Sequence, residues 1–498
     1  METSNKFALF PYLLKVFFII FIPLFATIFN IWKFFLVVAV PFRLDYAEGF
    51  VFSNSISALH GVSIYRLTET APYIFGFYTP LYNYIGSLFL SIFGTEISIL
   101  RILSFIFFLA TGYCVAWIVK KNTKSTIAAL LSAVLLYSSF IVSQWSAIAR
   151  PDMLGLFLIA LGISVSTLNK KSKGVLVVIA ALFALAFFAK QQFVFAPLAL
   201  CLTYLFENKK KAVFFGIIYV FFLGMGILTL SIFTNGEFTK QIFLYAGSVP
   251  YTNLYTAFRI IGITCVASLP LLFLATRRIT SKPKNFFSVY LLCTLISFVM
   301  LVRDGGIQNY LLEFILALIL ISVTSLSWEK IEALHFLKLI PLIIIFQFFF
   351  LLWSYSAFPW EIKQYVTERK KLFNKEISSI EPGSRLLTED PLIAFAIDSE
   401  ITIDPYTFGQ LIDSHLLSSV NLFSEINTGT YLYIDDYGAF NRIPNFESFK
   451  DDSYDILLEL RLEHPVKPFD YSLYNKNLIT DIGTLYVYNP QKSIPSGL

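Results

Sequence analysis

The chain is dominated by a series of apolar stretches, each close to the length of a membrane-crossing helix, with short charged interruptions between them. One crossing takes about 20 apolar residues, and stretches of this kind recur as far as Trp353. The pattern predicts about eleven membrane-spanning helices. They are expected at residues 16–40, 97–119, 125–145, 152–168, 174–189, 192–206, 212–233, 259–276, 285–302, 307–326 and 335–353.

The composition agrees with this pattern. Of the 498 residues, 56% are hydrophobic and only 14% are charged, and the mean hydropathy is +0.69. A soluble globule with so few polar residues has no means of covering its surface. The sequence therefore predicts an integral membrane protein.

Charge divides the chain into two parts. Residues 1–354 hold 26 Lys and Arg against 12 Asp and Glu, whereas residues 355–498 hold 12 against 21. In the acidic part, short apolar runs alternate with helix-like pieces, which predicts a small α/β domain. The predicted fold is an α-helical polytopic membrane protein with this domain at its C-terminus. The runs expected as strands are "RLLTED", "EITIDP", "TYLYIDDY" and "TLYVYNP"; the pair Asp435 and Asp436 fits either a strand that ends in a turn or a cation site.

The orientation follows from the lysines and arginines. If the N-terminus lies in the cytoplasm, every basic cluster falls in a cytoplasmic loop, as the positive-inside bias requires. Residues 41–96 then form the first extracytoplasmic loop, and residues 355–498 also lie outside. Within that loop, residues 78–94 are expected to form a helix in the membrane interface, with Tyr78, Tyr82 and Tyr84 at headgroup level. The basic clusters are Lys120, Lys121 and Lys124; Lys170, Lys171 and Lys173; Lys209 to Lys211; and Arg277, Arg278, Lys282 and Lys284.

Two carboxylates in the first extracytoplasmic loop, Asp45 and Glu48, are the leading catalytic candidates. Because they are three residues apart, one helical turn places them on one face, where they can hold an acceptor hydroxyl or a divalent cation such as Mg²⁺ or Mn²⁺. Either carboxylate, if burial raises its pKa, can act as a general base. The spacing equally fits a helix cap or a solvated loop.

Cations on the same side of the membrane are candidates for binding an anion. Arg150 precedes Pro151 at the start of a predicted span, and Asp152 can orient it or cap the helix. Lys190, with Gln191 and Gln192, is expected at the outer apex of a helical hairpin. Phosphate binding and a structural role, an ion pair or a lysine that reaches the interface, both fit these positions.

A second polar group surrounds the sequence "RDGGIQNYLLEF". Asn309 and Glu313 are four residues apart on one helix face, and Arg303 stands beside a Gly-Gly turn at the helix N-terminus, where anions bind. Glu313 lies about one turn into the membrane, where an unpaired carboxylate is costly. Lys190 or Arg303 is its expected partner.

Several classes of site lack their sequence signature. The chain contains no Walker loop, dinucleotide fingerprint, zincin helix or nucleophile elbow. Its four histidines are scattered and its four cysteines all fall in apolar segments, which argues against a histidine-based metal site or a disulfide framework. No nucleic-acid partner is expected.

The order of these motifs resembles the GT-C superfamily, polytopic glycosyltransferases that use polyprenyl-phosphate sugars, and in particular the bacterial branch with ArnT-type and protein mannosyltransferase-type enzymes. The resemblance covers most of residues 40–326. It is carried by "DYAEG", "YTPLYNYIGSLFLSIFG", "RILSFIFFLATGYCVAWIVKK", "ARPDMLGLFLIALG", "LAFFAKQQFVFAPLAL" and "GGIQNYLLEF".

This resemblance implies an inverting sugar transfer from a lipid phosphate on the outer face of the plasma membrane. Asp45 would be the general base with Glu48 beside it, and a divalent cation held by both is left open because some superfamily members need one. The acceptor, lipid, glycan or protein, is also open, and the C-terminal domain is assigned to acceptor recognition or to a lid. The remaining roles are donor-phosphate binding by Arg150, Lys190, Arg303 and Arg66, with support from Asp152, Gln191, Asn309 and Glu313.

Two other functions are compatible with the sequence. A transporter or flippase of lipid-linked saccharides would place ionisable residues near the bilayer midplane, whereas here they crowd one side, with Lys338 as the conspicuous exception. A catalytically inactive scaffold of the same fold is the other alternative. Turnover of a substrate distinguishes both from an enzyme.

Overall fold

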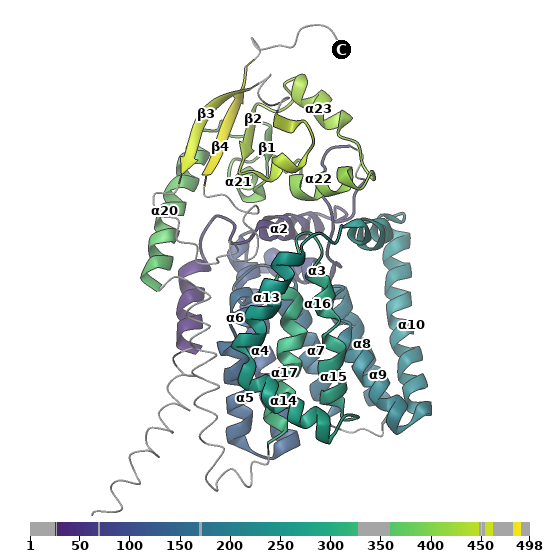
Figure 1. Ribbon diagram of the computed structural model, residues 1–498. Coiled ribbons are helices and arrows are strands. Elements are labelled where there is room, and N and C mark those ends of the chain that lie inside the picture. Colours follow the sequence, from purple (N-terminus) through teal and green to yellow (C-terminus); the bar gives the residue numbers. More distant parts are fainter. Residues whose placement is uncertain are drawn as a thin grey trace, which may run out of the picture.

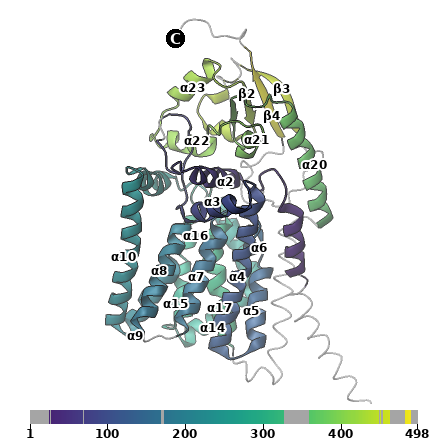
Figure 2. The same cartoon turned by 180° about the vertical axis from the view of Figure 1, so that it is seen from behind.

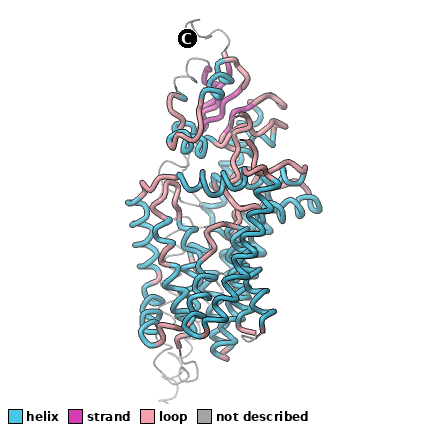
Figure 3. The backbone as a smooth tube through the Cα atoms, turned by 90° about the vertical axis from the view of Figure 1, so that its right-hand side faces the viewer, coloured by secondary structure: helices cyan, strands magenta, loops and turns pink. Residues whose placement is uncertain are grey.

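The computed structural model describes residues 25, 27–67, 70–168, 172–326, 359–447, 450, 454–461 and 482–489. Figure 1 shows a bundle of helices and, at one end of it, a smaller part that contains a sheet. In Figure 3 the strands are confined to this smaller part, whereas the bundle consists of helices and loops. The predicted fold class, helical with a small sheet, agrees with this architecture. The predicted boundary between residues 354 and 355 lies outside the described residues.

The bundle helices form where the sequence has its apolar runs. Side-chain caps mark several of their starts: Ser125 accepts a hydrogen bond from Ala128 N, and Asn208 accepts one from Lys211 N. The bundle comprises Thr27–Val37, α4 (Ile97–Thr123), α5 (Thr126–Ser138), α6 (Phe140–Trp145), α7 (Asp152–Ser166), α8 (Lys173–Ala189), α9 (Phe195–Glu207), α10 (Lys209–Phe233), α13 (Leu254–Ala267), α14 (Leu269–Ser281), α15 (Phe286–Thr294), α16 (Ser297–Met300) and α17 (Leu312–Thr324).

One predicted span is divided by a sharp bend. Residues 259–276 belong to α13 and α14, which meet at Ser268 with a bend of 82°. Pro270 lies in the first turn of α14, where its missing N–H costs nothing, whereas inside a continuous helix it would remove a hydrogen bond. The proline therefore favours a new helix start over one straight span.

Length and apolar composition identify two described helices that could each cross a membrane alone, α4 and α10, or three if α13 and α14 count as one bent span. Shorter apolar helices of 10–17 residues make up most of the remaining bundle. The number of crossings, about eleven, stays a prediction. Residues 335–353, including Lys338, and all of residues 16–24 lie outside the described residues.

Two helices lie across the end of the bundle that faces the sheet, α2 (Tyr46–Leu59) and α3 (Leu81–Phe93) (Figures 1 and 2). The helix expected within 78–94 is therefore present. The connections from α4 to α5, from α9 to α10 and from α14 to α15, where the basic clusters occur in the sequence, lie at the opposite end (Figure 1). This polarity agrees with the predicted orientation, which itself stays a prediction.

The C-terminal part contains a four-stranded sheet in the order β1-β2-β4-β3. Strands β1 and β2 are parallel, and the other pairs are antiparallel. The run "EITIDP" is not one of its strands, because Ile403 makes only an isolated bridge to Tyr73. The elements are α20 (Pro359–Ser378), β1 (Leu386–Thr388), α21 (Pro391–Ala396), α22 (Pro405–Asp413), α23 (Val420–Asn427), β2 (Tyr433–Asp436), η4 (Ala439–Arg442), β3 (Tyr454–Arg461) and β4 (Ile482–Tyr488).

The paired aspartates of β2 have protein partners. Asp435 accepts a hydrogen bond from the Thr388 hydroxyl at 2.7 Å, and Asp436 pairs with Lys450 at 3.1 Å. A strand that ends in a turn therefore describes this pair better than a cation site does.

The sheet-containing part is fixed to the bundle by buried polar contacts. Arg43 pairs with Glu389 at 2.9 Å, and the Tyr46 hydroxyl donates to Asp404 Oδ1 at 2.8 Å. Short elements complete the junction: α11 (Glu237–Thr239), η1 (Lys240–Tyr245), α12 (Ala246–Ser248) and η2 (Gln308–Leu311). The junction encloses the cavity described next.

Candidate functional site

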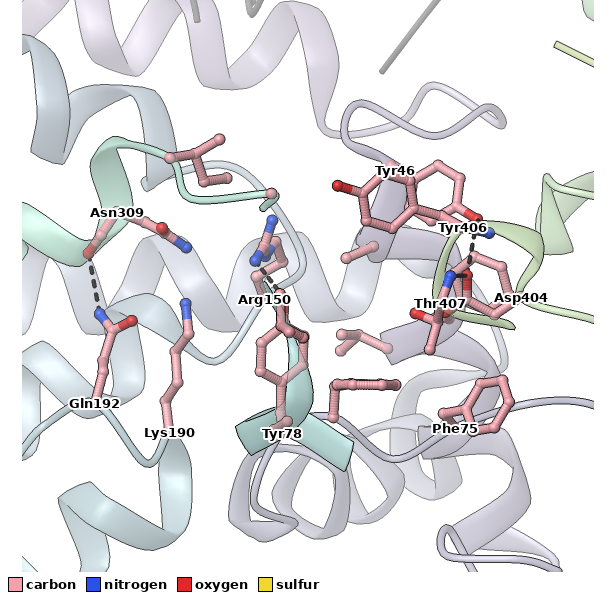
Figure 4. Close-up of a pocket in the computed structure, with 18 of the residues that line it drawn as sticks. Tyr46, Phe75, Tyr78, Arg150, Lys190, Gln192, Asn309, Asp404, Tyr406 and Thr407 are labelled. Atoms are coloured by element: carbon pink, nitrogen blue, oxygen red, sulfur yellow. Dashed lines mark hydrogen bonds between the residues drawn. The ribbon is translucent and has the colours of Figure 1, made fainter. Parts of the chain in front are cut away.

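A cavity of about 260 Å³ lies between the end of the bundle and the C-terminal part. Its walls come from the start of α2, the loop before α3, the α8–α9 connection, the loop that follows α16, and α22. Figure 4 shows basic and amide side chains at one end, and aromatic side chains with Thr407 and Asp404 at the other. The polar residues that line it are Asp45, Tyr46, Asn54, Tyr78, Asn83, Arg150, Lys190, Gln191, Gln192, Arg303, Asp304, Asn309, Tyr310, Asp404, Tyr406, Thr407 and Gln410.

Asp45 is placed by the start of α2, where it is the N-cap residue in extended backbone conformation. Its Oδ1 accepts hydrogen bonds from Ala47 N at 3.1 Å and from Arg150 Nη1 at 2.6 Å. No described residue donates a hydrogen bond to its second oxygen, Oδ2. Asp45 therefore presents one acceptor oxygen that is not used by the fold.

Arg150 is held on several sides. One Nη contacts Asp45, the other donates to the Tyr78 hydroxyl, and Nε lies 3.4 Å from Asp152 Oδ2. The guanidinium also stands 4.8 Å from the ring centroid of Trp145 and 5.3 Å from that of Tyr78, within the range of cation–π attraction. Its position is thus fixed before any ligand binds.

Asp152 organises the basic end of the cavity. Its Oδ1 accepts from Lys190 Nζ at 2.7 Å and from Asn309 Nδ2 at 3.0 Å. Gln192 in turn donates to the Asn309 carbonyl at 3.0 Å (Figure 4). The α7 N-terminus, the α8–α9 connection and η2 therefore meet at one buried carboxylate.

Arg303 reaches the cavity from the loop between α16 and η2. One Nη donates to the Ala246 carbonyl, and its buried Nε has no hydrogen-bond partner among the described residues. Gly305 has φ +72°, and a Cβ on Gly306 would lie 2.5 Å from the Leu301 carbonyl oxygen. The loop conformation therefore requires both glycines.

Burial shifts the proton affinity of two groups outside the membrane-spanning helices. It raises the pKa of Asp45 above that of an ordinary aspartate, although Arg150 opposes the change. It lowers the pKa of Lys190 to about 8, against the opposing effect of Asp152. A raised carboxyl pKa suits a general base, and Lys190 keeps its charge near neutral pH.

Glu48 does not share the cavity with Asp45, which corrects the expectation of a joint catalytic or metal-binding pair. Arg101 of α4 takes both of its oxygens, Nε to Oε1 and Nη2 to Oε2, each at 2.8 Å. Ala149 N and Leu44 N donate to the same carboxylate at 2.8 and 2.7 Å. The side chains of Glu48 and Arg101 are both fully buried, so Glu48 is a structural ion-pair partner.

The structure does not place Arg66 among the cavity residues, contrary to its expected role in phosphate binding. Its guanidinium donates to the Ser57 hydroxyl at 2.6 Å and to the Ser63 carbonyl at 3.1 Å. Gln191, in contrast, lines the cavity and donates to the Phe77 carbonyl at 2.8 Å.

Glu313 has a different partner from the one expected. Its Oε1 accepts hydrogen bonds from Ala196 N at 2.8 Å and from the Tyr290 hydroxyl at 3.1 Å. Glu313 therefore binds a free backbone N–H in the first turn of α9 and does not pair with Lys190 or Arg303. It is not among the cavity residues.

The tyrosines of the α3 segment do not all lie at a membrane interface. The Tyr78 ring faces Arg150, and its centroid lies 5.2 Å from Lys190 Nζ. Tyr82 is buried, and its hydroxyl lies 2.8 Å from the Ser104 hydroxyl. Only Tyr84, 47% exposed, fits the expected headgroup position. The sequence also gave no sign that Tyr406, Thr407 and Gln410, from a segment more than 300 residues after α2, would complete the cavity wall.

Asp45 and Glu48 do not together form a divalent metal site in the described structure. No three His, Cys, Asp or Glu side chains gather as metal ligands within the described residues. Glu48 has no oxygen to spare, and one oxygen of Asp45 already accepts two hydrogen bonds. The cavity instead offers one carboxylate oxygen opposite several fixed cations, which suits an anionic ligand with a hydroxyl to deprotonate.

Comparison with known proteins finds a matching family model and solved structures of similar fold. Residues 78–234 match the sequence model of the family described as dolichyl-phosphate-mannose-protein mannosyltransferase. ArnT from Cupriavidus metallidurans, in a crystal structure bound to undecaprenyl phosphate, is similar with a TM-score of 0.61 and 10% identity over 95% of this chain and 99% of that one. The apo state of the same enzyme gives a TM-score of 0.59 and 11% identity over 100% of both chains. No curated protein sequence matches.

The resemblance to the GT-C superfamily is thereby confirmed. The chain has the mostly helical, multi-pass membrane fold of GT-C glycosyltransferases, with a small sheet.

Proposed function

We propose that this protein transfers a sugar from a polyprenyl-phosphate-linked donor to an acceptor, with inversion at the anomeric carbon. The observation that carries the proposal is that one cavity holds the Asp45 carboxylate together with three cations, Arg150, Lys190 and Arg303. Support comes from the fold, shared with an ArnT structure that has undecaprenyl phosphate bound. The family model is likewise named for a dolichyl-phosphate sugar.

In the proposed reaction, the acceptor oxygen attacks the anomeric carbon from the face opposite the phosphate. The bond from that carbon to the phosphate oxygen breaks, and its electron pair leaves with the lipid phosphate. The acceptor proton passes to Asp45, whose Oδ2 no described residue occupies. A general base of this kind contributes about 10²–10⁴-fold to the rate.

The leaving phosphate gains negative charge as the bond breaks, and fixed cations stabilise that charge more in the transition state than before it. Arg150 places a fixed positive charge at the cavity, and the buried Nε of Arg303 has no hydrogen-bond partner among the described residues. Lys190 adds a compact positive charge. Asp152 contacts both Arg150 and Lys190, and Asn309 donates to the same Asp152 carboxylate.

The location of the cavity fits a lipid-linked donor. It lies at the end of the bundle, beneath the C-terminal part, where α2 and α3 cross the helix ends (Figure 1). A phosphate headgroup can reach this depth while its polyprenyl tail stays in the bilayer. We place this end on the extracytoplasmic side of the plasma membrane, because the basic clusters occur at the other end.

The test is transfer in vitro with purified protein and a panel of radiolabelled polyprenyl-phosphate sugars. We expect label to leave the lipid with wild type, and Asp45→Asn to lose about 10²–10⁴-fold of that rate because no base takes the proton. Glu96→Gln, a matched change at an exposed carboxylate, should keep the wild-type rate. Parallel reactions with EDTA test the divalent cation.

Wild-type turnover in Asp45→Asn would remove Asp45 from the mechanism. If no donor loses label even with membrane extract as acceptor, the enzyme proposal fails. Movement of a lipid-linked saccharide across vesicles containing the protein would then support a transporter.

A further inference from the structure

The residue that follows Arg303, Asp304, also lines the cavity, and its carboxylate contacts the C-terminal part. Asp304 Oδ2 accepts from Arg442 Nη1 at 2.5 Å and from Gln410 Nε2 at 2.9 Å. Its Oδ1 accepts from Arg442 Nη2 at 3.3 Å and from the Tyr406 hydroxyl at 3.4 Å. One carboxylate of the bundle thus receives four hydrogen bonds from the C-terminal part.

The segment before α13 also holds the loop that carries Arg303 and Asp304: Asn253 N donates to the Val302 carbonyl at 2.8 Å, and an Arg303 Nη donates to the Ala246 carbonyl. Asp304 N donates to the Pro250 carbonyl at 2.8 Å, and Gly306 N donates back to the Arg303 carbonyl at 2.8 Å. Gly305 brings the loop so close to the C-terminal part that a Cβ there would lie 3.0 Å from the Tyr406 hydroxyl. Residues 303–306 are therefore held on one side by residues 246–253 and, across the junction, by the C-terminal part.

The groups that hold Asp304 also contact one another. The Arg442 guanidinium stacks 4.1 Å from the ring centroid of Tyr406. Its backbone, in η4, presses on α22, because a Cβ on Gly409 would lie 2.8 Å from the Arg442 carbonyl oxygen. Arg442, Tyr406 and Gln410 form one unit facing Asp304, because α22 and η4 pack together.

We infer that the Asp304–Arg442 ion pair, with Gln410 and Tyr406, is a latch by which the C-terminal part holds Arg303 toward the donor phosphate. Asp304 and Arg442 are then positioning residues, and the C-terminal part belongs to the phosphate-binding machinery. This inference rests on the proposed function. It gives the domain a role beyond acceptor recognition.

A merely adhesive ion pair would behave differently. Loss of adhesion lowers the stability of the junction, which Arg43 with Glu389 also supports, but it does not act through Arg303. A latch affects phosphate binding only through Arg303. Once the Arg303 guanidinium is removed, loss of the latch should therefore not weaken phosphate binding further. A double-mutant cycle separates the two cases.

The measurement is the equilibrium Kd of the solubilised full-length protein for polyprenyl phosphate without a sugar. Arg303→Gln and Arg442→Gln should each weaken binding about tenfold, the change that about 1.4 kcal/mol produces. The double variant should bind no more weakly than Arg303→Gln alone. Arg442→Lys should recover part of the loss, and Arg385→Gln, at an exposed arginine of the same part, should bind as wild type.

Wild-type affinity in Arg442→Gln would overturn the latch, and so would a double variant in which the two losses multiply to about a hundredfold. Thermal unfolding of each variant shows whether it is folded. If Arg442→Gln does not fold, Asp304→Asn tests the same pair from the bundle side with the same expectations. A wild-type protein that binds no polyprenyl phosphate would instead refute the proposed function and, with it, the latch.

Discussion

Asp45 and Glu48 are three residues apart at the start of one helix, yet they have opposite surroundings. Asp45 shares one oxygen between Ala47 N and Arg150 and leaves the other toward the cavity. Glu48 spends both oxygens on Arg101 and two backbone amides, with no exposed surface. A carboxylate whose acceptor sites are all filled cannot take a substrate proton. The unused Oδ2 of Asp45, rather than the three-residue spacing of the two carboxylates, identifies Asp45 as the candidate base.

The variant Glu48→Gln is the strongest test of the contrast between Glu48 and Asp45. Removal of one partner from a fully buried ion pair leaves the other charge uncompensated and costs about 3–5 kcal/mol. Arg101 would be that charge, held against Glu48 and the carbonyls of Val37, Val40 and Phe42. We therefore expect a large drop in the unfolding temperature and a low yield of folded protein. Asp45→Asn should unfold much closer to wild type.

The contrary result would be informative. A Glu48→Gln variant that unfolds like wild type but does not turn over donor would return Glu48 to the catalytic machinery. It would also show that Arg101 finds compensation elsewhere.

Arg150→Gln is expected to have the next largest effect. A hydrogen bond to a charged group is worth about 1.5–3 kcal/mol, so kcat/KM should fall by roughly 10–100-fold. The variant should also move the acidic limb of the pH profile. Burial already raises the pKa of Asp45 and Arg150 opposes that rise, so without Arg150 the pKa rises further and the base becomes protonated at higher pH. An unchanged acidic limb would contradict the assignment of that limb to Asp45.

The helices were largely predictable from the sequence, because the length of an apolar run is a local property. The described α8, at residues 173–189, differs from the predicted span by one residue at its start. The bend between α13 and α14 was missed although Pro270 was visible in the sequence. The run "EITIDP" has strand-like alternation but meets only Tyr73, since sheet membership depends on partners distant in the chain.

The basic end of the cavity was predictable for a different reason. Charge near a bilayer is costly, so Arg150, Lys190, Arg303 and Asn309 stood out in apolar surroundings, and the fold brings them to one cavity. The partners of the carboxylates were not predictable. Arg101 lies 53 residues from Glu48 in the sequence. It is a lone charge inside an apolar helix, and this was the one sequence signal that it needs a buried partner.

Lys190 provides a smaller, pH-dependent test of the cationic end. Its pKa is lowered to about 8 by burial, so the side chain is charged below that pH and progressively neutral above it. The donor KM should therefore stay level well below pH 8 and rise severalfold as the pH passes through about 8. Lys190→Arg, whose guanidinium stays charged, should remove that alkaline rise. KM measured from pH 6 to 9.5 for both proteins checks this, and an identical rise in Lys190→Arg would assign it to another group.

The smallest effect is expected at Arg66, which the structure separates from the other predicted phosphate ligands. Its guanidinium contacts Ser57 and Ser63 rather than the cavity, and changes at such positions usually alter stability by less than about 0.5 kcal/mol. Arg66→Gln should therefore keep the donor KM within about twofold of wild type, measured beside Arg150→Gln in the same assay. A tenfold rise in KM would mean that the loop carrying Arg66 turns toward the donor during the reaction. Arg66 would then rejoin Arg150 and Lys190 as a phosphate ligand, and the cationic end would extend beyond the cavity described above.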